Sequence, residues 1–165
     1  GHLAGIYASL STMGKIIFYG TAPVAAVMFP LVSKSHARKG NYKKVFLWSL
    51  LLTSMIVGTL ILVYWLFPRV VLTLLYGSKF LEGAPYLVWF GIFIGLFTIS
   101  SLFLNYFLSK GTTKAVYIGL FAAIAQIVGI YLFHTDLFQV ISVSIGVSLV
   151  LLISLVIYFS YDAAR

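Results

Sequence analysis

Residues 45–67 read Val-Phe-Leu-Trp-Ser-Leu-Leu-Leu-Thr-Ser-Met-Ile-Val-Gly-Thr-Leu-Ile-Leu-Val-Tyr-Trp-Leu-Phe, without a single charged residue. A helix needs about 20 predominantly apolar residues to cross the roughly 30 Å hydrocarbon core of a bilayer. Fourteen of these 23 residues are Leu, Ile, Val or Phe, and each such residue favours insertion by roughly 0.3 to 0.6 kcal/mol. The stretch is therefore predicted to be a transmembrane helix.

The composition of the whole chain agrees with this prediction. Its 165 residues are 62% apolar and only 8% charged, whereas a soluble domain is roughly 45 to 50% apolar and about 25% charged. So few charges cannot cover a water-exposed surface, and so apolar a chain is not disordered. The sequence has no cysteine, which excludes a disulfide scaffold and a thiolate metal site. We expect an all-α, polytopic membrane protein.

Four further stretches are long enough to cross a bilayer, and Lys15 is the only charged residue within them. The five predicted spans are residues 4–33, 45–67, 83–109, 115–133 and 137–161. Each proline removes a backbone donor from a helix, so Pro23 and Pro30 predict a kink in the first span, near Pro23. Residues 69–76 form a short amphipathic segment, which we expect to lie at the membrane interface as a helix that ends at Gly77.

The basic residues predict the orientation of the spans. Eight of the eleven fall on one side, namely Lys34, Arg38, Lys39, Lys43, Lys44, Lys110, Lys114 and Arg165, and the other three are Lys15, Arg69 and Lys79. Loops rich in Lys and Arg stay in the cytoplasm. We therefore expect the first span to enter from outside and the C-terminus to be cytoplasmic, in the inner membrane. The net charge of +8 then reflects topology and not nucleic-acid binding.

The first span carries a recognisable arrangement of residues. Gly5 and Tyr7 precede the basic Lys15, and the segment Ala-Pro-Val-Ala-Ala-Val-Met-Phe-Pro-Leu-Val-Ser follows at residues 22–33. This order is similar to a G-x-Y pattern, then a basic residue, then F-P-x-x-S.

A second segment, Phe-Pro-Arg-Val-Val-Leu-Thr-Leu-Leu-Tyr-Gly at residues 67–77, is followed by Phe80 and Ala84. It is similar to a P-x-x-I-x-x-L-L-F-G junction. With the intervening basic loop, the two segments resemble the polysaccharide flippases that export O-antigen or teichoic acid precursors. These belong to the superfamily that also contains the multidrug (MATE) exporters and the lipid II flippase.

The resemblance implies that residues 1–165 are the C-terminal transmembrane bundle of a MATE-like transporter with 12 to 14 helices in two pseudo-symmetric halves. Its N-terminal half would be missing here. By resemblance, the complete protein flips a polyprenyl-pyrophosphate-linked oligosaccharide across the membrane by alternating access. A multidrug exporter is an alternative, although acidic residues within the spans would be more typical of it. A lipid II flippase, a membrane-embedded glycosyltransferase or acyltransferase, and a structural assembly subunit are further alternatives.

Three polar residues within the spans are candidates for substrate binding. Lys15 lies about three turns into the first helix, where it would either meet substrate phosphates in a cavity or extend to the outer headgroups. Asn105 and Gln126 are amides that would either bind sugar hydroxyls or join helices by hydrogen bonds.

The basic loop and the small residues have simpler interpretations beside functional ones. Lys34, Arg38, Lys39, Lys43 and Lys44 would capture an anionic lipid carrier or fix the topology on anionic membrane lipids, each contributing roughly 1 kcal/mol. Pro23 and Pro30 are candidate hinges, or static kinks. The pairs Gly91 with Gly95, and Ser142 with Gly146, predict close helix packing.

The remaining polar residues show no catalytic pattern. The three histidines are dispersed, and the three carboxylates, Glu82, Asp136 and Asp162, lie outside the uncharged spans. This spacing fits neither a metal site nor an activated nucleophile. We expect a transporter and not an enzyme, without a metal or a cofactor.

Overall fold

The computed structural model of the protein describes residues 2–164, except for the side chains of residues 2–4 and of Lys79. Arg165 and the Lys79 side chain, which were used above to predict orientation, lie outside the described part. The elements in chain order are α1 (His2–Ala37), α2 (Tyr42–Leu66), α3 (Pro68–Tyr76), the 3-10 turn η1 (Ser78–Gly83), α4 (Ala84–Ser109), α5 (Lys114–Leu132) and α6 (Leu137–Ala163).

Five helices are long and apolar enough to cross a membrane: α1, α2, α4 together with the end of η1, α5 and α6. The predicted all-α polytopic bundle is confirmed. The largest difference from the predicted spans is at the end of α1, which continues four residues beyond residue 33 to Ala37. Lys34 and His36 lie in this last turn, where cationic side chains interact favourably with the negative end of the helix dipole.

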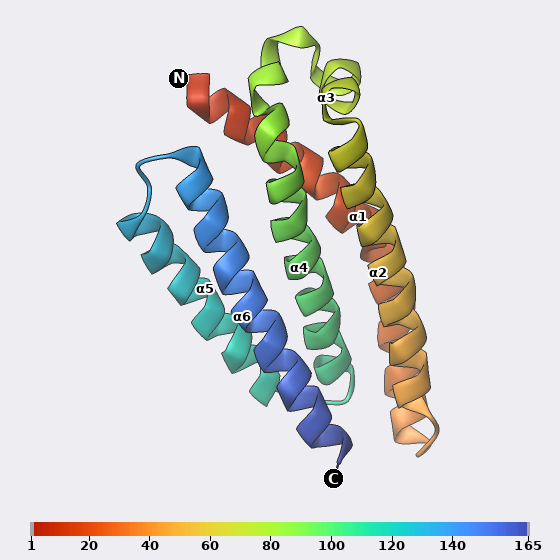
Figure 1. Cartoon of the computed structure of the whole chain (residues 1–165). Coiled ribbons are helices and arrows are strands. Elements are labelled where there is room, and N and C mark those ends of the chain that lie inside the picture. The colour runs from red at the N-terminus through yellow and green to blue at the C-terminus, as the bar shows by residue number, and fades with distance from the viewer. Residues whose placement is uncertain (1, 165) are drawn as a thin grey trace.

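Helix α4 is the centre of the bundle. It packs against α1, α2 and α6, whereas α5 packs mainly against α6 at the periphery (Figure 1). In the most apolar 18-residue stretch of α4, half of the residues are buried, whereas in that of α5 only 6% are buried. Successive spanning helices run in opposite directions, so the α1–α2 turn, the α4–α5 turn and the C-terminus lie at one end (Figure 1). This end, called the basic end below, carries Lys34, Arg38, Lys39, Lys43, Lys44, Lys110 and Lys114.

Helix α1 changes direction along its length. Figure 1 shows its first half crossing the bundle obliquely and its second half running beside α2. Pro23 and Pro30 lie inside this helix. Pro23 cannot donate a hydrogen bond to the carbonyl of Tyr19, and the proline ring crowds that carbonyl, which is the usual cause of such a bend.

The predicted short helix between the second and third spans is confirmed as α3, which begins at Pro68 and ends before Gly77. Gly77 has a φ of 76°, a left-handed conformation that glycine adopts without strain. Leu72 is fully buried, whereas Leu74 is 81% exposed, as expected for an amphipathic helix. The 3-10 turn η1, whose residues 78–83 connect α3 to α4, was not predicted from the sequence.

Glycines allow α4 to approach its neighbours closely. A Cβ atom added to Gly95 would lie 2.7 Å from Val57 Cγ1 of α2, and one added to Gly91 would lie 3.1 Å from Tyr64 Cδ2. The predicted close packing at Gly91 and Gly95 is confirmed. The prediction for Ser142 and Gly146 is wrong, because nothing lies within 4 Å of a Cβ built on Gly146.

The close contact between α5 and α6 forms at a different glycine. A Cβ built on Gly129 of α5 would lie 2.6 Å from Val143 Cγ1 of α6. Ser142 and Gly146 are instead exposed, and Gly146 lines an open apolar groove with residues of α5. A small-residue pair in one helix does not show which neighbour, if any, it contacts.

We predict that Gly95→Ala lowers the free energy of unfolding by about 1 to 2 kcal/mol, because the buried Val57 must shift to admit the new methyl group. The matched control is Gly58→Ala in α2, where nothing lies within 4 Å of the added Cβ. The control is expected to be neutral or slightly stabilising, since alanine has the higher helix propensity. Equilibrium unfolding of the full-length protein in detergent measures both; equal effects would contradict the predicted contact.

Candidate functional site

The three predicted substrate-binding residues do not converge on one site. Lys15 lies on α1, Asn105 on α4 near the basic end, and Gln126 on the peripheral helix α5. Gln126 Nε2 donates a hydrogen bond of 3.3 Å to Ser144 Oγ, which joins α5 to α6. A third amide, Gln139, was overlooked in the sequence analysis and is exposed in the first turn of α6.

Lys15 is exposed, and the residues just before it fix its height in the bundle. The Tyr64 hydroxyl donates a 2.8 Å hydrogen bond to the Met13 carbonyl, and Gly14 packs against Phe90. Tyr64 lies in the last turn of α2, two residues before its end at Leu66. Gly14 also packs against Ile94 of α4. Lys15 therefore lies in the half of the bundle opposite the basic end.

The face of α1 that carries Lys15 differs from the other exposed faces of the bundle. At helical spacing it presents three polar side chains, three alanines and the aromatic residues Tyr19 and Phe29. The polar and small residues are Ala8, Ser11, Lys15, Ala22, Ala26 and Ser33, of which Ser11 and Ala22 are half-buried. The exposed faces of α2 and α5 consist instead of large apolar side chains, such as Leu47, Trp48, Leu51 and Met55, and Tyr117, Leu120, Phe121 and Ile127. We call the face with Lys15 the polar stripe.

Asn105 lines a partly open cavity of about 100 Å³ between α1, α2 and α4, called the polar cavity below because its largely apolar walls include several hydroxyls and an amide. The lining residues are Phe18, Thr21, Ala22, Ala25, Thr53, Thr98, Ser101, Leu102 and Asn105. Small-molecule sites usually have roughly 300 to 1,000 Å³, whereas a water molecule takes about 30 Å³ of liquid volume. The cavity has the size of about three waters and is smaller than a usual ligand site.

Two threonine hydroxyls in this cavity, like the Tyr106 hydroxyl elsewhere in the bundle, are buried without a hydrogen-bond partner among the described residues. Many Ser and Thr side chains in the helices donate to the carbonyl three or four residues earlier in their own helix, as Thr59 and Ser100 do. Thr53 and Thr98 are buried, yet the Oγ1 atom of neither has a hydrogen-bond partner among the described residues. Because both line the same cavity, they offer hydrogen bonds to a small polar occupant, and water satisfies such groups in protein interiors.

We predict that Thr98→Val lowers the free energy of unfolding by about 1 kcal/mol, because water that occupies the cavity would lose this hydroxyl as a hydrogen-bond partner. Thr59→Val is the control, since Thr59 is exposed and bonds its own helix, and its effect should stay within about 0.5 kcal/mol. Chemical unfolding in detergent measures both variants. A stabilised Thr98→Val protein would indicate that the cavity is dry.

Two of the basic side chains at the basic end have specific partners. The Lys110 ammonium lies 2.5 Å from a carboxylate oxygen of Asp162 and 5.2 Å from the ring centroids of Tyr42 and Tyr106. Lys43 Nζ donates a 3.1 Å hydrogen bond to the Ala163 carbonyl in the last turn of α6. These contacts tie the end of α6 to α2 and α4.

We predict that Asp162→Asn lowers the free energy of unfolding by about 2 kcal/mol, because the Lys110 side chain is only 6% exposed and loses its counter-charge. The double variant Lys110→Met with Asp162→Leu should recover part of the loss, since no charge then remains buried. A thermal or chemical unfolding series of the full-length protein measures this. An Asp162→Asn protein as stable as wild type would show that the pair contributes nothing.

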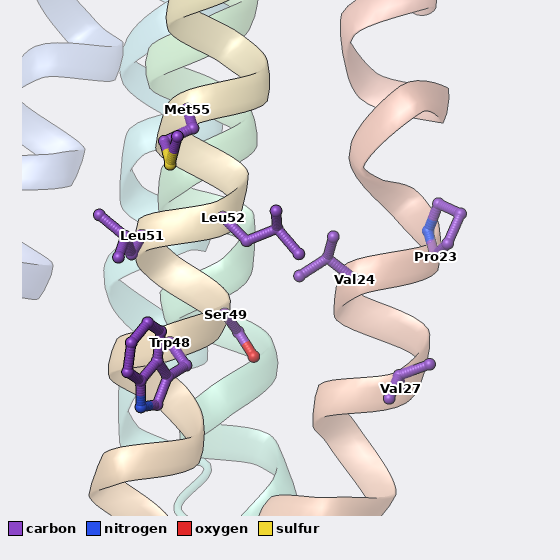
Figure 2. Close-up of a pocket in the computed structure, with 8 residues that line it drawn as sticks. All are labelled: Pro23, Val24, Val27, Trp48, Ser49, Leu51, Leu52 and Met55. Carbon is purple, nitrogen blue, oxygen red and sulfur yellow. The ribbon is translucent and has the colours of Figure 1, made fainter.

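An apolar groove of about 530 Å³ lies between α1 and α2 on the outside of the bundle (Figure 2). It is lined by Pro23, Val24, Val27, Trp48, Ser49, Leu51, Leu52 and Met55. Figure 2 shows Val24 and Leu52 pointing toward each other across it. One of the two candidate hinge prolines thus lines this groove, and the other, Pro30, is exposed about two turns further along α1.

Comparisons with protein-family models, curated proteins and solved structures gave no match to this chain. Within the described residues, no group of three or more His, Cys, Asp or Glu side chains could hold a metal ion. The functional interpretation therefore depends on the geometry of the bundle and on the sequence resemblance.

Proposed function

We propose that the chain is part of an inner-membrane transporter that flips lipid-linked oligosaccharide precursors by alternating access between two helix bundles. The two segments that resemble polysaccharide flippases support this proposal: residues 5–33 lie in α1, and residues 67–77 run from the end of α2 through α3. In this proposal the described bundle is one MATE-like half, the N-terminal half provides the other wall of the passage, and the basic end is cytoplasmic.

The observation that carries the proposal is the polar stripe on α1. An exposed transmembrane face that contacts lipid is usually made of large apolar side chains, as on α2 and α5. Small residues in membrane helices instead allow close approach of another helix, and ionisable residues face protein or a water-filled cavity. The stripe therefore suits a surface that faces a second bundle across a polar passage.

The charge of Lys15 fits this chemistry. A pyrophosphate-linked sugar headgroup cannot cross hydrocarbon without a polar path and compensating cations. Lys15 is an exposed cation at the end of the stripe opposite the basic end. We propose that Lys15 binds the substrate phosphates at the outer part of the passage. In this proposal the protein moves the substrate and catalyses no covalent step.

Deletion of the full-length gene tests the proposed function directly. Lipid-linked glycan should accumulate on the inner leaflet of the deletion strain, and the wild-type gene should restore its appearance on the outer face. If the glycan reached the outer face at the normal rate in a strain with no redundant flippase, the proposal would fail.

We predict that Lys15→Gln, expressed in the deletion strain at the wild-type level, slows transport by about tenfold, since a hydrogen bond between charged groups contributes roughly 1.5 to 3 kcal/mol. Lys15→Arg should retain most of the activity. Arg69→Gln is the matched control, because Arg69 lies on α3 at the same end but outside the stripe. Normal transport by Lys15→Gln would make Lys15 an anchor to the headgroups.

A further inference from the structure

The two helix faces that form the groove between α1 and α2 each continue beyond the groove to a lysine, Lys34 on α1 and Lys44 on α2. On α1, Pro23, Val27, Pro30 and Lys34 are spaced i, i+4, i+7 and i+11, so they share one face of the helix. Pro23 and Val27 line the groove, and Lys34 lies on the same face at the basic end. The α1 wall is thus apolar over its length and cationic at its end.

The α2 wall repeats this arrangement in the opposite chain direction. Lys44, Trp48, Leu51 and Met55 have the same i, i+4, i+7 and i+11 spacing, and the last three line the groove. Residues 38–41 form a tight turn between the two helices. Since the helices are antiparallel, both exposed lysines lie at the same end of the groove.

The groove, taken together with the continuation of its two walls to the lysines, matches one leaflet of a bilayer in length. Eleven residues of helix rise about 16 Å, so each lysine lies about that distance from the far end of its wall. Half of the roughly 30 Å hydrocarbon core is about 15 Å. If an acyl chain lies in the groove with its end at the level of Met55 and Pro23, the headgroup of that lipid would lie at the level of the two lysines.

We propose that this groove binds an anionic phospholipid of the leaflet at the basic end. One acyl chain occupies the channel between Val27 and Leu52, Trp48 lies at the boundary between chain and headgroup, and the ammonium groups of Lys34 and Lys44 bind the phosphate. Tryptophan is enriched at this boundary, and basic side chains attract anionic headgroups there.

Charge and length both favour this occupant over others. Lys43 and Lys110 are directed to α6 and Asp162, so the groove lysines are distinct from the basic residues that hold the bundle together. A zwitterionic lipid would gain less from two cations. A polyprenyl phosphate long enough to cross both leaflets would extend beyond a groove of one leaflet.

The test is lipid binding to the full-length protein in detergent, measured by native mass spectrometry. Dioleoylphosphatidylglycerol should bind more tightly than dioleoylphosphatidylcholine. Lys34→Gln and Lys44→Gln should each weaken phosphatidylglycerol binding about fivefold. Lys114→Gln is the matched control, because Lys114 is exposed at the same end on α5, away from the groove.

The groove itself is tested by Val27→Trp, which fills it; Val27 is 60% exposed and tolerates a larger side chain. The control is Leu120→Trp, at a 55% exposed position on α5. Val27→Trp should weaken phosphatidylglycerol binding and Leu120→Trp should not. Three results would overturn the proposal: an equal loss with Lys114→Gln, unchanged binding by Val27→Trp, or displacement of phosphatidylglycerol by an equal concentration of long-chain polyprenyl phosphate.

Discussion

The bundle depends on the absence of water from the hydrocarbon core, which obliges every backbone polar group within a span to find a partner in the protein. Helices meet this requirement for almost every residue. Pro23 and Pro30 create exceptions, because neither can donate a hydrogen bond to the carbonyl four residues earlier, at Tyr19 and at Ala26. The polar cavity with Thr21, Thr53, Thr98 and Asn105 lies against the part of α1 that contains Pro23, so several polar side chains gather where this helix departs from regular geometry.

The contacts of helix α4 also explain how the helices associate, although the surrounding lipid is as apolar as their own side chains. Gly91 and Gly95 bring α4 close to α2, and Gly14 of α1 admits the ring of Phe90. At the basic end the contacts are aromatic: Phe46, Tyr106 and Phe159 have ring centroids within 5.5 Å of one another. Close backbone approach and ring packing thus hold different levels of the same helix.

The spans, the helix α3 and the Gly91–Gly95 contact were predictable because each is encoded locally, by length, by period or by two small residues one turn apart. The Lys110–Asp162 pair was not, since the two residues are 52 positions apart and both had been placed in exposed segments. The polar cavity was missed for a related reason: Thr53 and Thr98 are single hydroxyls in apolar helices, and only the packing of α2 and α4 brings them together. Ser142 and Gly146 show the opposite error, because the local pattern is present but no neighbour approaches.

The lysines at the basic end therefore differ in their roles because their surroundings differ, although all of them carry the same charge. Lys110 is nearly buried, with a carboxylate and two aromatic rings around it, and Lys43 binds the carbonyl of a helix end. Such cations stabilise the protein itself. Lys34 and Lys44 are exposed at the end of an apolar groove, and an exposed cation beside hydrocarbon gains most from an anion held at the same depth. A count of basic residues predicts which side faces the cytoplasm, but the chemistry available to each residue depends on which helix faces it joins.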